Sequence, residues 1–189
     1  MTATSAPTSS AARVILAVGG GIAAYKSAAL CSRLAQAGCE VRVAMSKAAT
    51  EFVGPATFAA LSGHPVATDS FAPDRWPLGP HIELADGARL MIVAPATAQL
   101  IGQFAHGLAG DLIATLYLQA ECPVLLAPAM SGVMWEKAAV RRNIDRLRDD
   151  GCQFVGPDQG WLSCRRSGAG RMSEPEQIAA QALAMIHVD

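Results

Sequence analysis

Residues 13–26, with the sequence RVILAVGGGIAAYK, place three consecutive glycines directly after a short apolar run. Residues 14–18 show no alternation of polar and apolar side chains, which is typical of a parallel strand covered on both faces. Glycine has no Cβ, so the backbone N–H groups of Gly19, Gly20 and Gly21 can approach a ligand closely. A helix is expected from about residue 22 to 37, and its N-terminus favours an anion. The segment therefore predicts a phosphate site.

The ribose-binding acid of dinucleotide-binding proteins is missing from this chain. Such proteins carry an Asp or Glu about 20 residues after the glycine turn. Here the second expected strand, Glu40–Met45, ends in Met45 and Ser46 instead. This pattern disfavours NAD and favours a phosphate carried by another ligand. For this segment alone, a glycine turn that merely packs a helix against a strand is the alternative interpretation.

Composition limits the class of protein. A chain of 189 residues with 51% hydrophobic and 5% aromatic residues predicts one domain with an aliphatic, alanine-rich core. The formal net charge of -1 gives no bulk attraction to nucleic acid or anionic lipid. The arginines of residues 141–148 alternate with aspartates, which is typical of a solvated helix face. No apolar run approaches membrane-spanning length.

The cysteine pattern and the first residues indicate the cellular compartment of the protein. Five cysteines are scattered along the chain without a C-x-x-C pair, which favours a reducing compartment and argues against a zinc site. Residues 1–12 are rich in Ser, Thr and Ala but lack the charge and apolar core of a signal peptide. We therefore expect a cytoplasmic protein with a disordered tail at 1–12, a single domain at 13–189 and no metal.

Expected strands and helices alternate along the whole chain. After the second strand, Ser46 is expected to cap a helical segment that Pro55 divides, with a second piece at 56–61. The later expectations are a short strand at 65–67, a loop at 68–80, a strand at 89–94, helices at 97–105 and 108–119, a strand at 123–127, a helix at 133–150, a strand at 153–155, a glycine-rich segment at 156–172 and a helix at 174–186. This order predicts a doubly wound, mostly parallel α/β sheet of the Rossmann or flavodoxin type.

In such sheets ligands bind beyond the carboxyl ends of the strands. Those ends are expected to carry the glycine turn, Ser46 and the loops at 95–98 and 128–131. The sequence therefore predicts one crevice in which four strand ends converge.

Four motifs connect the chain to a known family: the loop PATA at 95–98, the loop PAMSGVMW at 128–135, the dipeptide His81-Ile82, and GWLSCRRSGAGRM at 160–172. With these motifs in the same order, residues 13–185 resemble the homo-oligomeric flavin-containing cysteine decarboxylases. That family includes phosphopantothenoylcysteine decarboxylase of coenzyme A synthesis and the peptidyl-cysteine decarboxylases of epidermin-like and cypemycin-like peptides. The resemblance implies an FMN cofactor and a homotrimer, which in some relatives assembles into a dodecamer with sites at subunit contacts.

The resemblance also assigns residues. His81 matches the active-site histidine, Met130 and Ser131 lie in the substrate loop, and Cys164 lies in the clamp over the active site. The residues implied in FMN binding are Gly20, Gly21 and Ile22 at the phosphate, and Ser46, Pro95, Ala96, Thr97 and Ala98 at the flavin pocket. For Thr97 a helix-capping role is an equal alternative, and Cys164 as a small packing residue is another.

Two departures from the family pattern affect the expected substrate. Ser131 replaces the usual Asn of the substrate loop, and Arg165 and Arg166 stand where many relatives carry Gly and an acid. These changes favour oxidative decarboxylation of a peptide's C-terminal cysteine to an aminoenethiol, with phosphopantothenoylcysteine as the alternative substrate. A non-catalytic flavin-binding subunit is a second alternative. A flavin prenyltransferase of related fold is disfavoured by the His81 motif and the Cys164 clamp.

Overall fold

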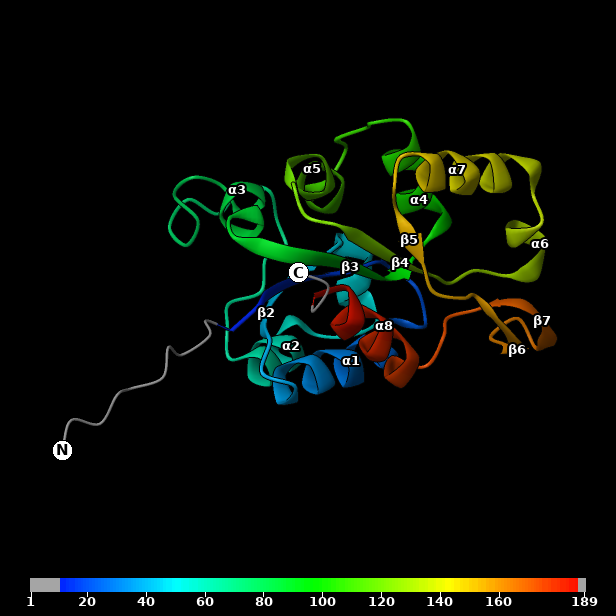
Figure 1. Cartoon of the computed structure of the whole chain (residues 1–189), viewed down its shortest axis with the longest axis horizontal. Helices are drawn as coiled ribbons and strands as arrows, with labels where there is room; N and C mark the ends of the chain where they lie inside the picture. Colours follow the sequence, from blue (N-terminus) through cyan, green and yellow to red (C-terminus); the bar gives the residue numbers. More distant parts are fainter. Residues whose placement is uncertain (1–10, 187–189) are drawn as a thin grey trace.

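A parallel sheet forms the centre of the molecule. The computed structural model describes residues 11–186, and in this part five strands pair in the order β2-β1-β3-β4-β5 (Figure 1). The strands are β1 (Arg13–Val18), β2 (Glu40–Met45), β3 (Ala88–Ala96), β4 (Val124–Pro128) and β5 (Gln153–Phe154). All four neighbouring pairs are parallel, so the predicted doubly wound α/β fold is confirmed. Most of the expected tail, residues 1–10, lies outside the described residues.

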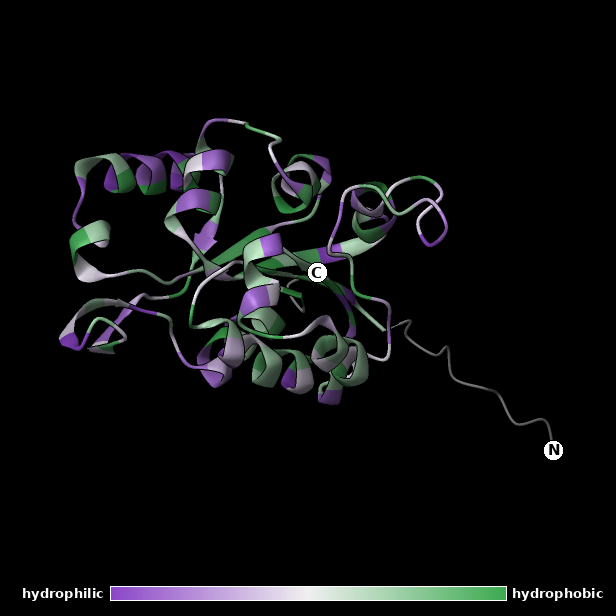
Figure 2. Cartoon of the chain, turned by 180° about the vertical axis from the view of Figure 1, so that it is seen from behind, coloured by the Kyte–Doolittle hydropathy of each residue, from purple (hydrophilic) through white to green (hydrophobic). Residues whose placement is uncertain are grey.

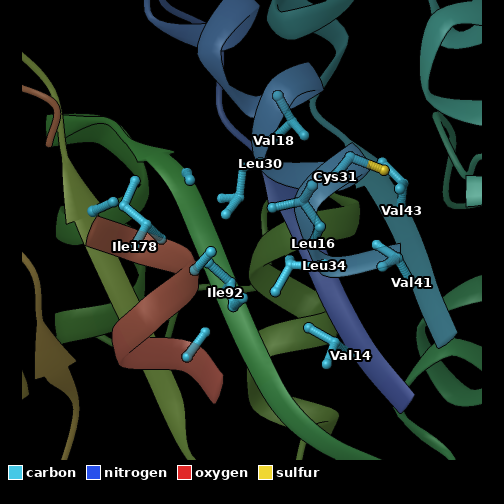
Figure 3. Packing of buried hydrophobic residues seen from close by; sticks show 14 of the residues in the cluster. Val14, Leu16, Val18, Leu30, Cys31, Leu34, Val41, Val43, Ile92 and Ile178 are labelled. Atoms are coloured by element: carbon cyan, nitrogen blue, oxygen red, sulfur yellow. The ribbon is translucent and has the colours of Figure 1, made fainter. Parts of the chain in front are cut away.

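Helices cover both faces of the sheet (Figure 1). One face carries α1 (Ala24–Gln36), α2 (Pro55–Ser62) and α8 (Pro175–Ile186), and the other carries α3 (Pro80–Ala85), α4 (Ala98–Ala105), α5 (Leu112–Gln119) and α7 (Ala138–Asp149). Alternate residues of β1 explain this arrangement, because successive strand side chains point to opposite faces. Leu16 packs in the cluster of Leu30 and Ile178 (Figure 3), whereas Ile15 packs in the cluster of Ile101.

The segment after β5 differs from the sequence-based expectation. Residues 156–172, predicted only as a glycine-rich segment, contain the antiparallel strands β6 (Asp158–Leu162) and β7 (Arg166–Arg171). We call residues 158–171 the clamp hairpin. Its loop ends at Arg165, whose φ of 60° is left-handed and whose N–H donates to Leu162 O at 2.9 Å. Glycine or asparagine normally takes this conformation, so the arginine concealed the turn in the sequence.

One predicted helix is interrupted. Instead of a single helix at 133–150, the chain forms the short α6 (Gly132–Trp135) and then α7. The backbone of Lys137 between them is extended, with ψ of 130°, so the first helix stops and the second starts at a new angle. Trp135, the last residue of α6, is buried beside this break.

Two further elements are shorter than predicted. The helix expected from residue 108 begins at Leu112, because the Asp111 carboxylate accepts a hydrogen bond from Ala114 N at 2.9 Å and caps it there. The strand expected at 65–67 is reduced to a single bridge between Ala44 and Ala67.

The surface agrees with the charge pattern of the sequence. Figure 2 shows hydrophilic residues along α7, whose Ile144 and Leu147 are buried while its arginines are exposed. Every helix within residues 11–186 is too short or too polar to cross a bilayer. In the same part of the chain no group of His, Cys, Asp and Glu side chains is arranged to hold a metal ion.

Candidate functional site

The glycine turn joins β1 to α1 and leaves backbone donors free. Within residues 11–186, the N–H groups of Gly20, Gly21 and Ile22 donate to no protein acceptor. A Cβ added to Gly20 would lie 2.3 Å from Ala48 Cβ, and one added to Gly19 would lie 2.3 Å from Pro95 O. The turn therefore packs as only glycine allows and presents three N–H groups ahead of α1. A phosphate monoester such as that of FMN fits these donors.

A hollow of about 460 Å³ lies on one side of this turn. Its lining includes Gly20, Ser46 and Thr97, three residues predicted to hold the cofactor. Ser46 Oγ accepts from Ala49 N at 3.1 Å, and Thr97 Oγ1 accepts from Leu100 N at 3.3 Å. Both hydroxyls cap the helical turns that follow, so the capping role of Thr97 is confirmed. Each hydroxyl can still donate its own proton to a ligand in the hollow.

The loop after β3 contributes mainly backbone. Pro95 and Ala96 are buried in the last residues of β3, and Ala98 is the half-buried first residue of α4. The carbonyl of Pro95 faces Gly19. Sequence reasoning missed four polar or charged residues that line the same hollow, Lys47, Glu51, Gln99 and Asp111. None of the four lies in a motif that marked it beforehand.

A second cavity, of about 290 Å³, lies on the other side of the glycine turn, and we call it the clamp crevice. Gly21 and Ile22 line it from the turn, Met130 and Ser131 from the loop after β4, and Cys164 from the clamp hairpin. The hairpin is held against the loop where Met130 N donates to Gly170 O at 2.9 Å. The two cavities thus bring most of the predicted cofactor and substrate residues to one edge of the sheet. Pro95, Ala96 and Ala98 lie beside them at the end of β3 without lining either cavity, and His81 is apart from both.

Charged groups at the base of the clamp crevice were not predicted. Lys26 and Arg171 line the crevice, and both donate to Glu174 Oε1, at 2.9 and 2.5 Å. The hydrogen bond from Lys26 is the main cause that holds the pKa of the Glu174 carboxyl below its ordinary value. Trp161 lies at the crevice with 66% of its surface exposed. In the sequence, the only sign of this charge cluster was an isolated lysine early in an alanine-rich helix.

His81 lies far from both cavities in the folded chain. It is the half-exposed second residue of α3, which precedes the nine-residue β3, whereas the glycine turn follows the carboxyl end of the parallel β1. A strand of this length spans roughly 27 Å. Figure 1 accordingly shows α3 and the clamp hairpin at opposite ends of the molecule. One chain by itself does not bring His81 to Cys164.

The cysteines differ sharply in accessibility, which predicts their reactivity. All five are free thiols, and Cys164 is exposed while Cys31 is buried. Burial raises the pKa of the Cys31 thiol to about 11, so at pH 8 this thiol is protonated as well as covered. We expect brief iodoacetamide treatment of the native protein, followed by peptide mass spectrometry, to label Cys164 first and Cys31 only after unfolding. Equal labelling rates would contradict the structure.

Comparison with known proteins agrees with the site. The sequence matches the flavoprotein family over residues 2–187. The coenzyme A biosynthesis bifunctional protein CoaBC of Bacillus subtilis is 50% identical over 165 residues, or 87% of this chain and 41% of that protein. The chain thus spans about two fifths of the length of the curated relatives it matches.

Two solved structures share the fold closely. The FMN-dependent cysteine decarboxylase SpaF superposes with a TM-score of 0.78 at 30% identity, covering 94% of this chain and 98% of its own. A cysteine-to-serine mutant of PPC decarboxylase, complexed with pantothenoylaminoethenethiol, gives a TM-score of 0.81 at 26% identity, covering 92% and 97%. The chain therefore belongs to the flavoprotein family and, within it, to the FMN-dependent cysteine decarboxylases.

Proposed function

We propose that the chain decarboxylates the cysteine of phosphopantothenoylcysteine, with a peptide's C-terminal cysteine as the second candidate. The observation that carries this choice is the 50% identity to a coenzyme A biosynthesis protein over 87% of the chain. SpaF is only 30% identical. The order of the two substrates is thus the reverse of the one expected from Ser131 and the hairpin arginines. Those departures are the observation in favour of a peptide.

The substrates can be compared directly. The protein, loaded with FMN, is offered phosphopantothenoylcysteine and a peptide ending in cysteine, and kcat/KM is measured for each. We expect a preference of at least about 100-fold for phosphopantothenoylcysteine, equivalent to about 2.7 kcal/mol. A preference for the peptide would establish the second candidate instead.

Loss of CO2 from the cysteine carboxylate needs an electron sink that side chains do not provide. Bound FMN would supply it as a reversible two-electron carrier for the CH2–SH group, so that the carboxylate is β to a C=S bond when CO2 is lost. Free N–H groups at Gly20, Gly21 and Ile22 would hold its phosphate. The hydroxyls of Ser46 and Thr97, which line the adjoining hollow, would donate to its polar atoms.

Two residues would move protons. The imidazole of His81 would take the proton of the substrate thiol, since histidine is the side chain that most often serves as a general base. The exposed thiol of Cys164, at the clamp crevice, would protonate the carbon from which CO2 has departed. That proton makes the product a saturated thiol and keeps the overall reaction redox-neutral. Without it, the enethiol would be released.

We further propose that a second copy of the chain supplies His81. The position of α3 at the amino end of β3, opposite the glycine turn, supports this arrangement. In a ring of copies, α3 of one copy would lie at the clamp crevice of the next. The trimer implied by the family resemblance satisfies this requirement.

Ser131 provides a test of substrate recognition. Its Oγ caps α6 by accepting from Met134 N at 3.4 Å, and asparagine is an equally good cap. We expect Ser131→Asn to fold normally and to lower KM for phosphopantothenoylcysteine by about 10-fold, because the amide adds one hydrogen bond to the substrate. The control Ser131→Ala loses the cap but gains no amide, so it should lower stability without lowering KM. An unchanged KM in Ser131→Asn would contradict this role.

A further inference from the structure

A charge cluster built around one buried lysine joins the glycine turn to the clamp hairpin. Only 8% of the Lys26 side chain is exposed, which is rare for an ammonium group unless it is paired. Its Nζ donates to Met172 O at 3.1 Å and to Glu174 Oε1 at 2.9 Å. The same Glu174 oxygen accepts from Arg171 Nη2 at 2.5 Å. One carboxylate oxygen is therefore shared by two cations from different parts of the chain.

The two cations belong to the two functional halves of the site. Lys26 lies in the first turn of α1, four residues after Ile22 of the phosphate turn. Arg171 is the last residue of β7, at the base of the hairpin that carries Cys164. Both side chains line the clamp crevice. The cluster thus links the first turn of α1, which follows the glycine turn, to the end of β7 through the Glu174 carboxylate.

We propose that Lys26 and Glu174 are positioning residues that couple FMN binding at the glycine turn to the placement of the clamp hairpin over the crevice. The inference deepens the proposed function, because the hairpin it positions carries the thiol assigned as proton donor. A phosphate on the free N–H groups fixes the first turn of α1. Lys26 then holds Glu174, and Glu174 holds Arg171 and the hairpin. Since coupling is reciprocal, a fixed hairpin also strengthens FMN binding.

The fold contains a matched control for this cluster. Arg33 of α1 forms an ion pair with Glu176 in the first turn of α8, two residues after Glu174, so it links α1 to the same region of the chain. That pair is about half exposed on both sides, and neither residue lines the clamp crevice. An exposed pair contributes little to stability. Glu176→Gln therefore removes a carboxylate two residues from Glu174 without touching the proposed coupling.

The test follows Cys164 and does not depend on catalysis. Iodoacetamide labelling of Cys164 is timed by peptide mass spectrometry, with and without saturating FMN, in wild type, Glu174→Gln and Glu176→Gln. We expect FMN to slow labelling at least about 5-fold in wild type and Glu176→Gln, and hardly at all in Glu174→Gln. The Kd for FMN should rise by a similar factor in Glu174→Gln alone. Acrylamide quenching of tryptophan fluorescence gives a second readout, because Trp161 is 66% exposed whereas Trp76 and Trp135 are buried.

Full protection of Cys164 by FMN in a folded Glu174→Gln protein would overturn the coupling, as would an equal loss of protection in Glu176→Gln. If Glu174→Gln does not fold, Glu174→Asp replaces it, and that variant should keep part of the protection. Unaltered protection and FMN affinity in Glu174→Asp and in Lys26→Met would also overturn it. A wild-type protein that shows the coupling but does not act on phosphopantothenoylcysteine would refute the proposed substrate and leave the coupling in place.

Discussion

Replacing Gly20 by alanine is expected to weaken FMN binding by at least about 100-fold, or about 2.7 kcal/mol. The added Cβ would lie 2.3 Å from Ala48 Cβ and 2.9 Å from Ala48 C, so backbone must move on one side of the contact. Either movement displaces the free N–H groups that face the phosphate. Fluorescence titration with FMN measures the change, and circular dichroism shows whether the fold is retained.

Gly102→Ala is the matched control. Gly102 lies inside α4 next to the same edge of the sheet, and a Cβ there would meet Asn143 Nδ2 at an ordinary 3.6 Å. Alanine is favoured over glycine within helices, so this variant should be more stable by roughly 0.5–1 kcal/mol and bind FMN as wild type does. Wild-type FMN affinity in Gly20→Ala would show that the phosphate is not held at this turn.

Replacing His81 by asparagine is expected to lower kcat by about 10²- to 10⁴-fold, the usual contribution of a general acid or base. FMN affinity should be unchanged, because the substitution alters none of the residues expected to hold FMN, which are the glycine turn, Ser46 and residues 95–98. Stability should also change by less than about 0.5 kcal/mol, since the side chain is half-exposed. Steady-state kinetics and FMN titration of the same preparation separate these effects.

Mixing two inactive variants tests whether His81 acts across subunits. Co-expressed His81→Asn and Gly20→Ala chains, carrying different affinity tags, should form mixed oligomers that recover part of the activity. In such an oligomer an intact glycine turn of one copy meets an intact His81 of another. Mixed oligomers that are purified through both tags and stay inactive would place His81 in the site of its own chain or outside the reaction.

Much of the scaffold could be predicted from local patterns. The unbroken apolar run of β1 indicated a strand covered on both faces, and Val14 to Val18 are all fully buried. Elements were missed where a residue adopts an unusual backbone conformation for its type. Arg165 occupies a left-handed position that glycine normally takes, and Lys137 interrupts a helix without a proline or glycine. Neither conformation follows from side-chain identity, and both side chains are exposed.

The part of the site that lies at the carboxyl ends of the strands could be predicted from the strand order. Parallel strands bring their carboxyl ends to one edge, so the glycine turn, Ser46, Thr97 and Met130 could be placed together before the structure was known. Lys26 could not be placed, because its partner Glu174 is 148 residues away in the sequence. The distance of His81 from the crevice was also hidden, since it depends on the length of β3 and on where α3 packs.

The most direct test is the mass of the product formed from phosphopantothenoylcysteine by the purified, FMN-loaded protein. The proposed reaction predicts a product lighter than the substrate by the mass of one CO2, with yellow protein throughout and no added oxidant. A product lighter by CO2 and two further hydrogens would show an oxidative enzyme in which Cys164 does not complete the cycle. Unchanged substrate in the presence of bound FMN would contradict the proposed function outright.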